Sequence, residues 1–142
     1  MKIEPLRPEH AAALAARVPG VPLDDPDHVA ELIAAGPAFA AIDSDGRPFA
    51  VLGVADHGGG RGFAWCALAH DARPAALAVS LTRAVRRWLA RSPFRRIEMV
   101  TVVGHEAAER WAIRLGFLFE SVSEAWTDTG ADVLRWSLVR RG

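Results

Sequence analysis

Few side chains in this sequence are suited to chemistry, and His105 is the foremost of them. It follows a β-branched stretch and precedes a helical pattern, so it is expected where a strand meets a helix. An imidazole titrates near neutral pH and can serve as a general base, but a polar side chain at this position also caps a helix or binds water. Cys66 is the sole cysteine. Acyl-enzyme chemistry at Cys66 requires a nearby base that the sequence does not identify, so a small buried side chain is the simpler interpretation.

A second candidate site lies where the apolar stretch Gly62–Ala69 gives way to a long helical pattern opened by Pro74. The first amides of such a helix have no partner within the helix and favour phosphate. A cation such as Arg73 adds a charge-assisted contact. The alternative is an ordinary helix start with a surface arginine. The amides concerned belong to Ala75, Ala76, Leu77 and Ala78.

The composition indicates one soluble globular domain. The chain has 142 residues, 51% of them hydrophobic, which is enough for a single core over residues 1–142. One cysteine allows neither an internal disulfide nor a cysteine-based zinc site. The acidic cluster at Asp24, Asp25 and Asp27 is explained by a capped helix start, so no metal is expected. Neither a signal peptide nor an apolar run of about 18 residues is present, so we expect a cytoplasmic protein without a membrane partner.

Charge is unevenly distributed along the chain. Residues 1–71 hold 5 basic and 10 acidic side chains and residues 72–142 hold 12 and 7, so the halves carry net charges of −5 and +5. This asymmetry suits a cleft for a phosphate-bearing ligand or a charged partner, although uneven solvated faces explain it equally well. The long helix carries Arg83, Arg86, Arg87 and Arg91. Without an aromatic reading surface or an overall positive charge, we expect no specific nucleic-acid partner.

Hydrophobic periodicity and turn residues divide the chain into elements in the order β-α-α-β-β-β-α-β-α-β-β. Three antiparallel strands precede a strand–helix–strand crossover, so the fold class is α/β (α+β): a mixed, mostly antiparallel sheet with helices on both faces. The strands at 62–69 and 96–103 are expected to be parallel neighbours. The glycines at 58–60 join two antiparallel strands and precede no helix, which excludes a phosphate loop. The other strands are expected at 2–7, 37–43, 48–56, 117–126 and 131–139, and the helices at 9–18, 26–33, 74–91 and 106–115.

This order and these lengths resemble the GNAT acetyltransferase fold over nearly the whole chain. The family pattern of Gln or Arg, two residues, Gly, one residue, then Gly or Ala is matched by Arg73 and Ala78, while Ala76 stands where glycine is usual. In HEAAERWAIRLGF, Ala108 and the final Leu-Gly-Phe match the family, His105 stands at the usual Asn and Ala112 at the usual Tyr.

The resemblance implies that acetyl-CoA is the acyl donor. Its pantetheine would pair with the backbone of Cys66, Ala67 and Leu68, and its pyrophosphate would bind the helix start at residues 75–78. The departures weaken this expectation. Pro74 removes one amide, the chain has no tyrosine to act as the acid, and the fourth strand has no glutamate to act as the base.

Two functions therefore stay open. One is acyl transfer to an unknown amine. The other is a catalytically inactive structural or interaction protein, because the strand GFAWCALA, the arginine-rich helix and RWAIRLGF also resemble the small GNAT-like proteins of tailed bacteriophages. The first predicts a cytoplasmic enzyme and the second a component of the virion. Either allows a homodimer through the last strands, since tryptophan is enriched at interfaces and Trp126 and Trp136 flank the last hairpin, where they are expected to pair.

Overall fold

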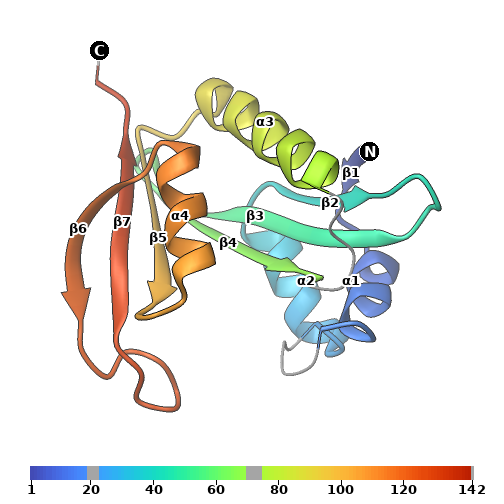
Figure 1. Cartoon of the computed structure of the whole chain (residues 1–142), viewed down its shortest axis with the longest axis horizontal. Coiled ribbons are helices and arrows are strands. Elements are labelled where there is room, and N and C mark those ends of the chain that lie inside the picture. The colour runs from blue at the N-terminus through green and yellow to red at the C-terminus, as the bar shows by residue number, and fades with distance from the viewer. Residues whose placement is uncertain (19–22, 70–74, 142) are drawn as a thin grey trace. The chain divides into compact units, whose positions relative to one another are not determined.

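A computed structural model describes residues 1–18, 23–69 and 75–141 (Figure 1). The order of elements is the one predicted from the sequence. Among the described residues, no helix combines the length and the apolar character needed to cross a membrane. The strands are β1 (Lys2–Pro5), β2 (Ala38–Ile42), β3 (Pro48–Gly58), β4 (Arg61–Leu68), β5 (Arg96–Val102), β6 (Leu118–Ser123) and β7 (Val133–Val139). The helices are α1 (Pro8–Ala15), α2 (Pro26–Ala35), α3 (Ala75–Arg91) and α4 (Glu106–Leu115).

The strands form one seven-stranded sheet in the order β1-β2-β3-β4-β5-β7-β6. The β1–β2, β2–β3, β5–β7 and β6–β7 pairs are antiparallel. The β4–β5 pair is parallel, with Arg61 opposite Arg96 and Phe63 opposite Glu98. The expected mixed, mostly antiparallel sheet is therefore confirmed, and so is the parallel pairing of the strands on either side of the long helix.

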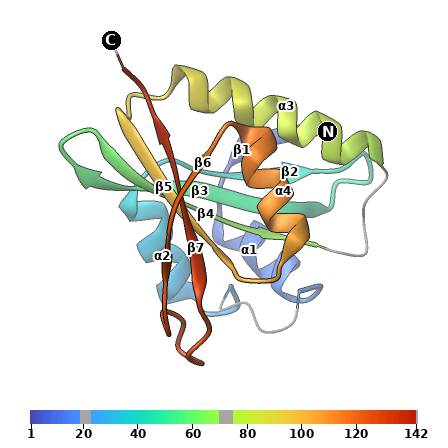
Figure 2. The same ribbon diagram turned by 60° about the vertical axis from the view of Figure 1, so that its left-hand side comes forward.

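The chain divides into two compact units, which are described separately. The first contains residues 1–56 and 64–81. In it, α1 and α2 lie on one face of the strands and the start of α3 lies on the other (Figures 1 and 2). Asp25 caps α2, as predicted, by accepting a hydrogen bond from the Asp27 amide at 3.0 Å. The core of this unit includes Leu14, Val29 and Val51, each almost completely buried.

The second unit contains residues 57–63 and 82–142. Trp111 on α4 donates its indole N–H to Thr82 Oγ1 on α3 at 2.9 Å, which fixes the two helices to each other. The carbonyls that end α3 are also satisfied. Arg140 donates to the carbonyl oxygens of Leu89 at 2.7 Å and Ser92 at 2.6 Å. A cation at this end of a helix also complements the helix dipole.

Glycine ends α4 and turns the chain between β3 and β4. Gly116 has φ 99° and closes α4 in the left-handed conformation, as the sequence predicted. Gly58, Gly59 and Gly60 all have positive φ, between 65° and 81°. Three successive residues in this region are accessible to glycine but costly for other residues. The triplet is thus a strand connection, in agreement with the sequence-based exclusion of a phosphate loop.

Three expectations for local structure are wrong. Helix α1 ends at Ala15 rather than Val18, because the Arg17 amide bonds to the Leu14 carbonyl only three residues back, at 2.8 Å, which tightens the last turn. Strand β6 ends at Ser123 because Ala125, with φ 47°, turns the chain. Trp126 and Trp136 do not pair across the hairpin. The residue opposite Trp136 is Phe119, and the two rings meet edge to face with centroids 6.0 Å apart.

A charged network lies on one face of the second unit's strands. Arg96 forms two hydrogen bonds with the Glu120 carboxylate, of 2.9 and 2.6 Å, and a third with Glu98 at 2.9 Å. Ser137 donates to Glu120 at 2.7 Å. Glu120 sits where the β6–β7 register shifts, so the bulge directs its side chain to Arg96. The Arg96 guanidinium, followed by the Ser137 hydroxyl, lowers the pKa of Glu120 from 4.5 to about 2.

This pKa predicts a contribution to stability in acid. Because the folded-state pKa lies below the ordinary value of 4.5, the contribution is complete above pH 4.5 and is lost as the pH falls towards 2. Glu120→Gln is expected to melt below the parent at pH 6 and to approach the parent's melting temperature near pH 2. Glu124→Gln, an exposed change just beyond β6, is the control. A constant difference between parent and Glu120→Gln from pH 6 to 2 would contradict the assignment.

Candidate functional site

The β4 segment expected to bind pantetheine alternates between the two faces of the sheet. Ala67 is buried, Leu68 is half-buried and Cys66 is exposed. The interpretation of Cys66 as a small buried side chain is therefore wrong, because its place in the alternation turns it away from the buried face. The register with β5 covers Arg61 to Phe63, so residues 66–68 lie beyond the portion of β4 that pairs with β5.

The start of α3 carries only small or half-buried side chains. Ala75, Ala76 and Ala78 are exposed and Leu77 is half-buried. The first turn has no acidic residue, so no side-chain charge there opposes an anion. The helix is 17 residues long, and the amides of the residues that open a helix have no acceptor within it. The phosphate contact expected at these residues stays a prediction. His70, Arg73 and Pro74 lie outside the described residues.

His105 caps α4. Its Nδ1 accepts a hydrogen bond from the Ala108 amide at 3.1 Å, the bond that a good N-cap residue makes to the third residue of a helix. An amide N–H only donates, so Nδ1 carries no proton and the neutral ring is protonated at Nε2. The one nitrogen able to accept a proton is thus already engaged. Base catalysis by His105 would require this cap to break.

This geometry predicts that His105 is structural. His105→Asp keeps a capping oxygen and adds a charge that the helix start favours, whereas His105→Ala loses about 1 kcal/mol of stability. We expect the Asp variant to match the parent in both melting temperature and acyl-transfer rate. A general base contributes about 10²- to 10⁴-fold, so a hundredfold loss of rate in a stably folded His105→Asp variant would assign the base role to His105 instead.

Three further positions, on β5, β3 and α4, have ordinary surroundings. Glu98 is half-buried and bonded to Arg96, as expected of a polar sheet residue. His57 is exposed near the end of β3 and stacks on Phe63 of β4, with centroids 6.2 Å apart. Ala112, at the family's tyrosine position, is completely buried and has no proton to donate. Within the described residues, no group of three or more His, Cys, Asp or Glu side chains is arranged to hold a metal ion.

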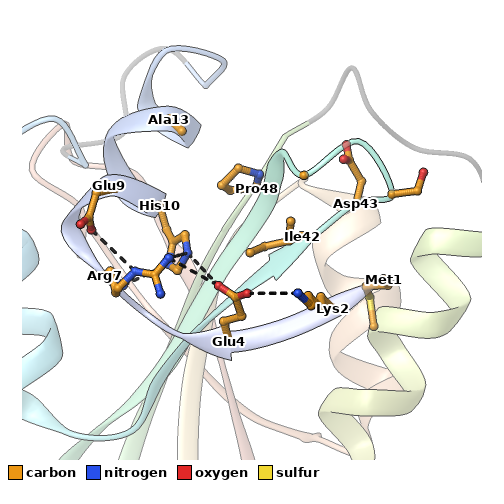
Figure 3. A pocket seen from close by; sticks show the side chains of 12 residues that line it. Met1, Lys2, Glu4, Arg7, Glu9, His10, Ala13, Ile42, Asp43 and Pro48 are labelled. Atoms are coloured by element: carbon orange, nitrogen blue, oxygen red, sulfur yellow. Dashed lines mark hydrogen bonds and ion pairs between the residues drawn. The ribbon is translucent and has the colours of Figure 1, made fainter.

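A hollow of about 650 Å³ lies in the first unit, beside β1, α1 and the β2–β3 turn (Figure 3). Glu4 is its centre. The Glu4 carboxylate lies 3.2 Å from His10 Nε2, 3.6 Å from the Arg7 guanidinium and 3.8 Å from Lys2 Nζ. His10 is buried, and its Nδ1 accepts the Arg7 backbone N–H at 3.1 Å.

These contacts determine the state of the His10 ring. Because Nδ1 accepts from an amide, the proton of the neutral ring is on Nε2 and faces the Glu4 carboxylate. The Arg7 guanidinium nitrogen that lies 3.2 Å from the same Nε2 cannot then donate to it. Glu4 is therefore paired with Lys2, Arg7 and His10, and these contacts hold the start of α1 against β1. Sequence reasoning did not identify this cluster. Its only signal was the spacing of Glu4, Arg7 and His10, three residues apart across a strand–helix boundary.

Comparison with protein-family models gives no match for this chain, and comparison with curated proteins gives none either. Solved structures do match. A putative phosphinothricin N-acetyltransferase has a TM-score of 0.81 at 11% identity, covering 99% of both chains. An acetyltransferase of the GNAT family from Streptococcus pneumoniae has a TM-score of 0.75 at 16% identity, covering 98% of this chain and 99% of that one.

A third similar structure is a chimera of the Vibrio cholerae spermidine N-acetyltransferase SpeG and hSSAT. Its TM-score is 0.76 at 13% identity, covering 98% of this chain and 96% of that one. The likeness extends over the whole length of each protein. The chain therefore has the fold of the GNAT acetyltransferases, as its order of elements predicted.

Proposed function

We propose that this protein transfers an acyl group from acetyl-CoA to an amine. The observation that carries the proposal is the start of α3: an exposed first turn of alanines, without acidic residues, directly after β4 in a fold shared with acetyltransferases. In the reaction, the amine nitrogen forms a bond to the thioester carbonyl carbon and the carbon–sulfur bond breaks. The amine loses a proton to solvent, and the sulfur leaves as thiolate.

The chain supplies binding and orientation. The amides of Ala75 to Ala78 are assigned to the pyrophosphate, with Arg73 beside it, and the backbone of Cys66 to Leu68 to the pantetheine. Holding both reactants in place accelerates transfer even without a proton-transferring side chain. The proposal thus fits a chain without tyrosine, in which His105 is occupied as a cap. It implies a modest enzyme that prefers amines already deprotonated.

Calorimetry with acetyl-CoA tests the proposal. We expect binding in the micromolar range or weaker, because Pro74 and Ala76 make a poorer phosphate contact than glycine would. Release of coenzyme A thiol in the presence of phosphinothricin or spermidine, the substrates named for two similar structures, then measures transfer. No heat at millimolar acetyl-CoA at two temperatures would exclude the proposal.

The second candidate is a non-catalytic interaction protein, and strand β6 favours it. β6 is an edge of the sheet, and its Leu118, Phe119 and Val122 are 73%, 54% and 51% exposed. Exposed apolar side chains on an unpaired edge are typical of a surface that binds another chain. The bound chain would be a second copy of this protein in a homodimer, or another protein in a virion. In sedimentation, this candidate predicts that the parent self-associates and that Phe119→Ser does so less. That result, with acetyl-CoA binding absent in both proteins, would support it.

A further inference from the structure

The indole N–H of Trp65 differs from others in this fold. Trp65 Nε1 is buried and has no hydrogen-bond partner among the described residues. In contrast, Trp111 Nε1 donates to Thr82 and Trp136 Nε1 to Thr101, both at 2.9 Å. A buried donor without an acceptor destabilises the folded chain. A native structure therefore retains such a donor for a reason, and one such reason is a ligand that completes the bond.

A glycine on the neighbouring strand holds the Trp65 ring in place. A Cβ at Gly53 of β3 would lie 2.8 Å from Trp65 Cζ2 and 3.0 Å from Cε2, the ring carbon bonded to Nε1. It would also lie 2.6 Å from the Pro37 carbonyl oxygen, just after α2. Only glycine lets the indole lie this close to the β3 backbone. The Trp65 ring thus packs directly against the β3 backbone at Gly53.

Trp65 also precedes the proposed pantetheine segment. The pyrophosphate is assigned to residues 75–78 and the pantetheine to Leu68, then Ala67, then Cys66. The acyl end of acetyl-CoA would continue towards the N-terminal end of β4, where the next residue is Trp65. All of these residues belong to the first unit. The whole residue is partly exposed although its nitrogen is covered, so a substrate oxygen that binds this N–H has to displace the atoms that cover it.

We propose that Trp65 Nε1–H binds an oxygen of the acceptor amine, an inference that rests on the proposed function. The recognised group is a carbonyl, carboxylate or phosphinate oxygen, because an N–H only donates. The acceptor is thus an amine that carries such an oxygen, as an amino acid or its amide does. A protonated polyamine offers donors alone and gives Trp65 no partner.

The variant that tests this is Trp65→Phe, which keeps a ring and removes the N–H. Its melting temperature is expected to equal or exceed the parent's, since no hydrogen bond is lost. Trp111→Phe and Trp136→Phe are matched controls that each lose a hydrogen bond to threonine, and both are expected to melt below the parent. A fall for Trp65→Phe as large as that of the controls would show that the N–H is already bonded in the free protein, and would overturn the proposal.

The ligand side is tested by the indole N–H signals in nitrogen-15 NMR. The Trp65 signal is the one missing from Trp65→Phe. In protein saturated with coenzyme A, phosphinothricin is expected to move this signal downfield and spermidine to leave it in place. In steady-state transfer, Trp65→Phe is expected to raise KM for phosphinothricin roughly three- to tenfold, with kcat and the affinity for acetyl-CoA unchanged.

Two outcomes separate this inference from the function it rests on. If acetyl-CoA gives heat in calorimetry and transfer proceeds, but phosphinothricin moves no indole signal, the role of Trp65 is wrong and the proposed function stands. If acetyl-CoA gives no heat, the proposed function fails by itself. A shift of the Trp65 signal with spermidine equal to that with phosphinothricin would also overturn the proposal, because it would show no preference for an oxygen.

Discussion

Ala76→Asp is expected to reduce acetyl-CoA affinity roughly 1,000-fold. The new carboxylate would stand in the first turn of α3, where the pyrophosphate is proposed to bind. Two unit charges about 4 Å apart repel by about 4 kcal/mol at the effective dielectric constant near a protein surface, and about 1.4 kcal/mol corresponds to a tenfold change in affinity. Calorimetry with acetyl-CoA on the parent and the variant measures the difference.

The same substitution carries its own control for folding. A carboxylate in the first turn of a helix stabilises the helix by about 0.3 to 1 kcal/mol, so Ala76→Asp is expected to melt no lower than the parent. Ala90→Asp, an exposed change near the other end of α3, places the same charge away from the proposed site. We expect Ala90→Asp to retain the parent's affinity. Equal affinity in parent and Ala76→Asp would show that the pyrophosphate does not lie on this turn.

Gly36→Ala is expected to cause the largest loss of stability. A Cβ at Gly36 would lie 2.1 Å from the Val54 carbonyl oxygen and 3.0 Å from the Asp56 amide nitrogen, both backbone atoms of β3. The end of α2 would have to move away from β3, at a cost of about 3 kcal/mol or more. In a chain of this size, that lowers the melting temperature by roughly 10 °C.

Gly46→Ala is the matched comparison for this loss. Gly46 has a φ of 78° and nothing within 4 Å of its would-be Cβ, so it tests backbone strain without a clash. The expected cost is about 1 kcal/mol, the penalty of the left-handed conformation. Melting curves of the two variants decide the matter. The close packing of α2 against β3 would be contradicted by Gly36→Ala melting no lower than Gly46→Ala.

Local patterns in the sequence determined the order and type of the elements. The period-two stretches, the helical stripes and the stop signals at Gly116 and Gly58–Gly60 act over a few residues, so they are legible without the fold. The parallel pairing of β4 with β5 followed as well, because a helix between two strands permits a right-handed crossover. The long helix was predicted as well, because its hydrophobic stripe recurs along one face over several turns, and the structure has it as α3.

Only the tertiary structure decided which side chains meet. The contact of Arg96 with Glu120 depends on a register shift between β6 and β7. The seat of Trp65 depends on Gly53, on a different strand. Such contacts join residues far apart in sequence, and strand register and strand face determine them. A shift of one residue in register turns every side chain of a strand to the opposite face. For that reason the sequence contained the parts of the candidate site, but not the exposure of Cys66, the capping bond of His105 or the unpaired indole of Trp65.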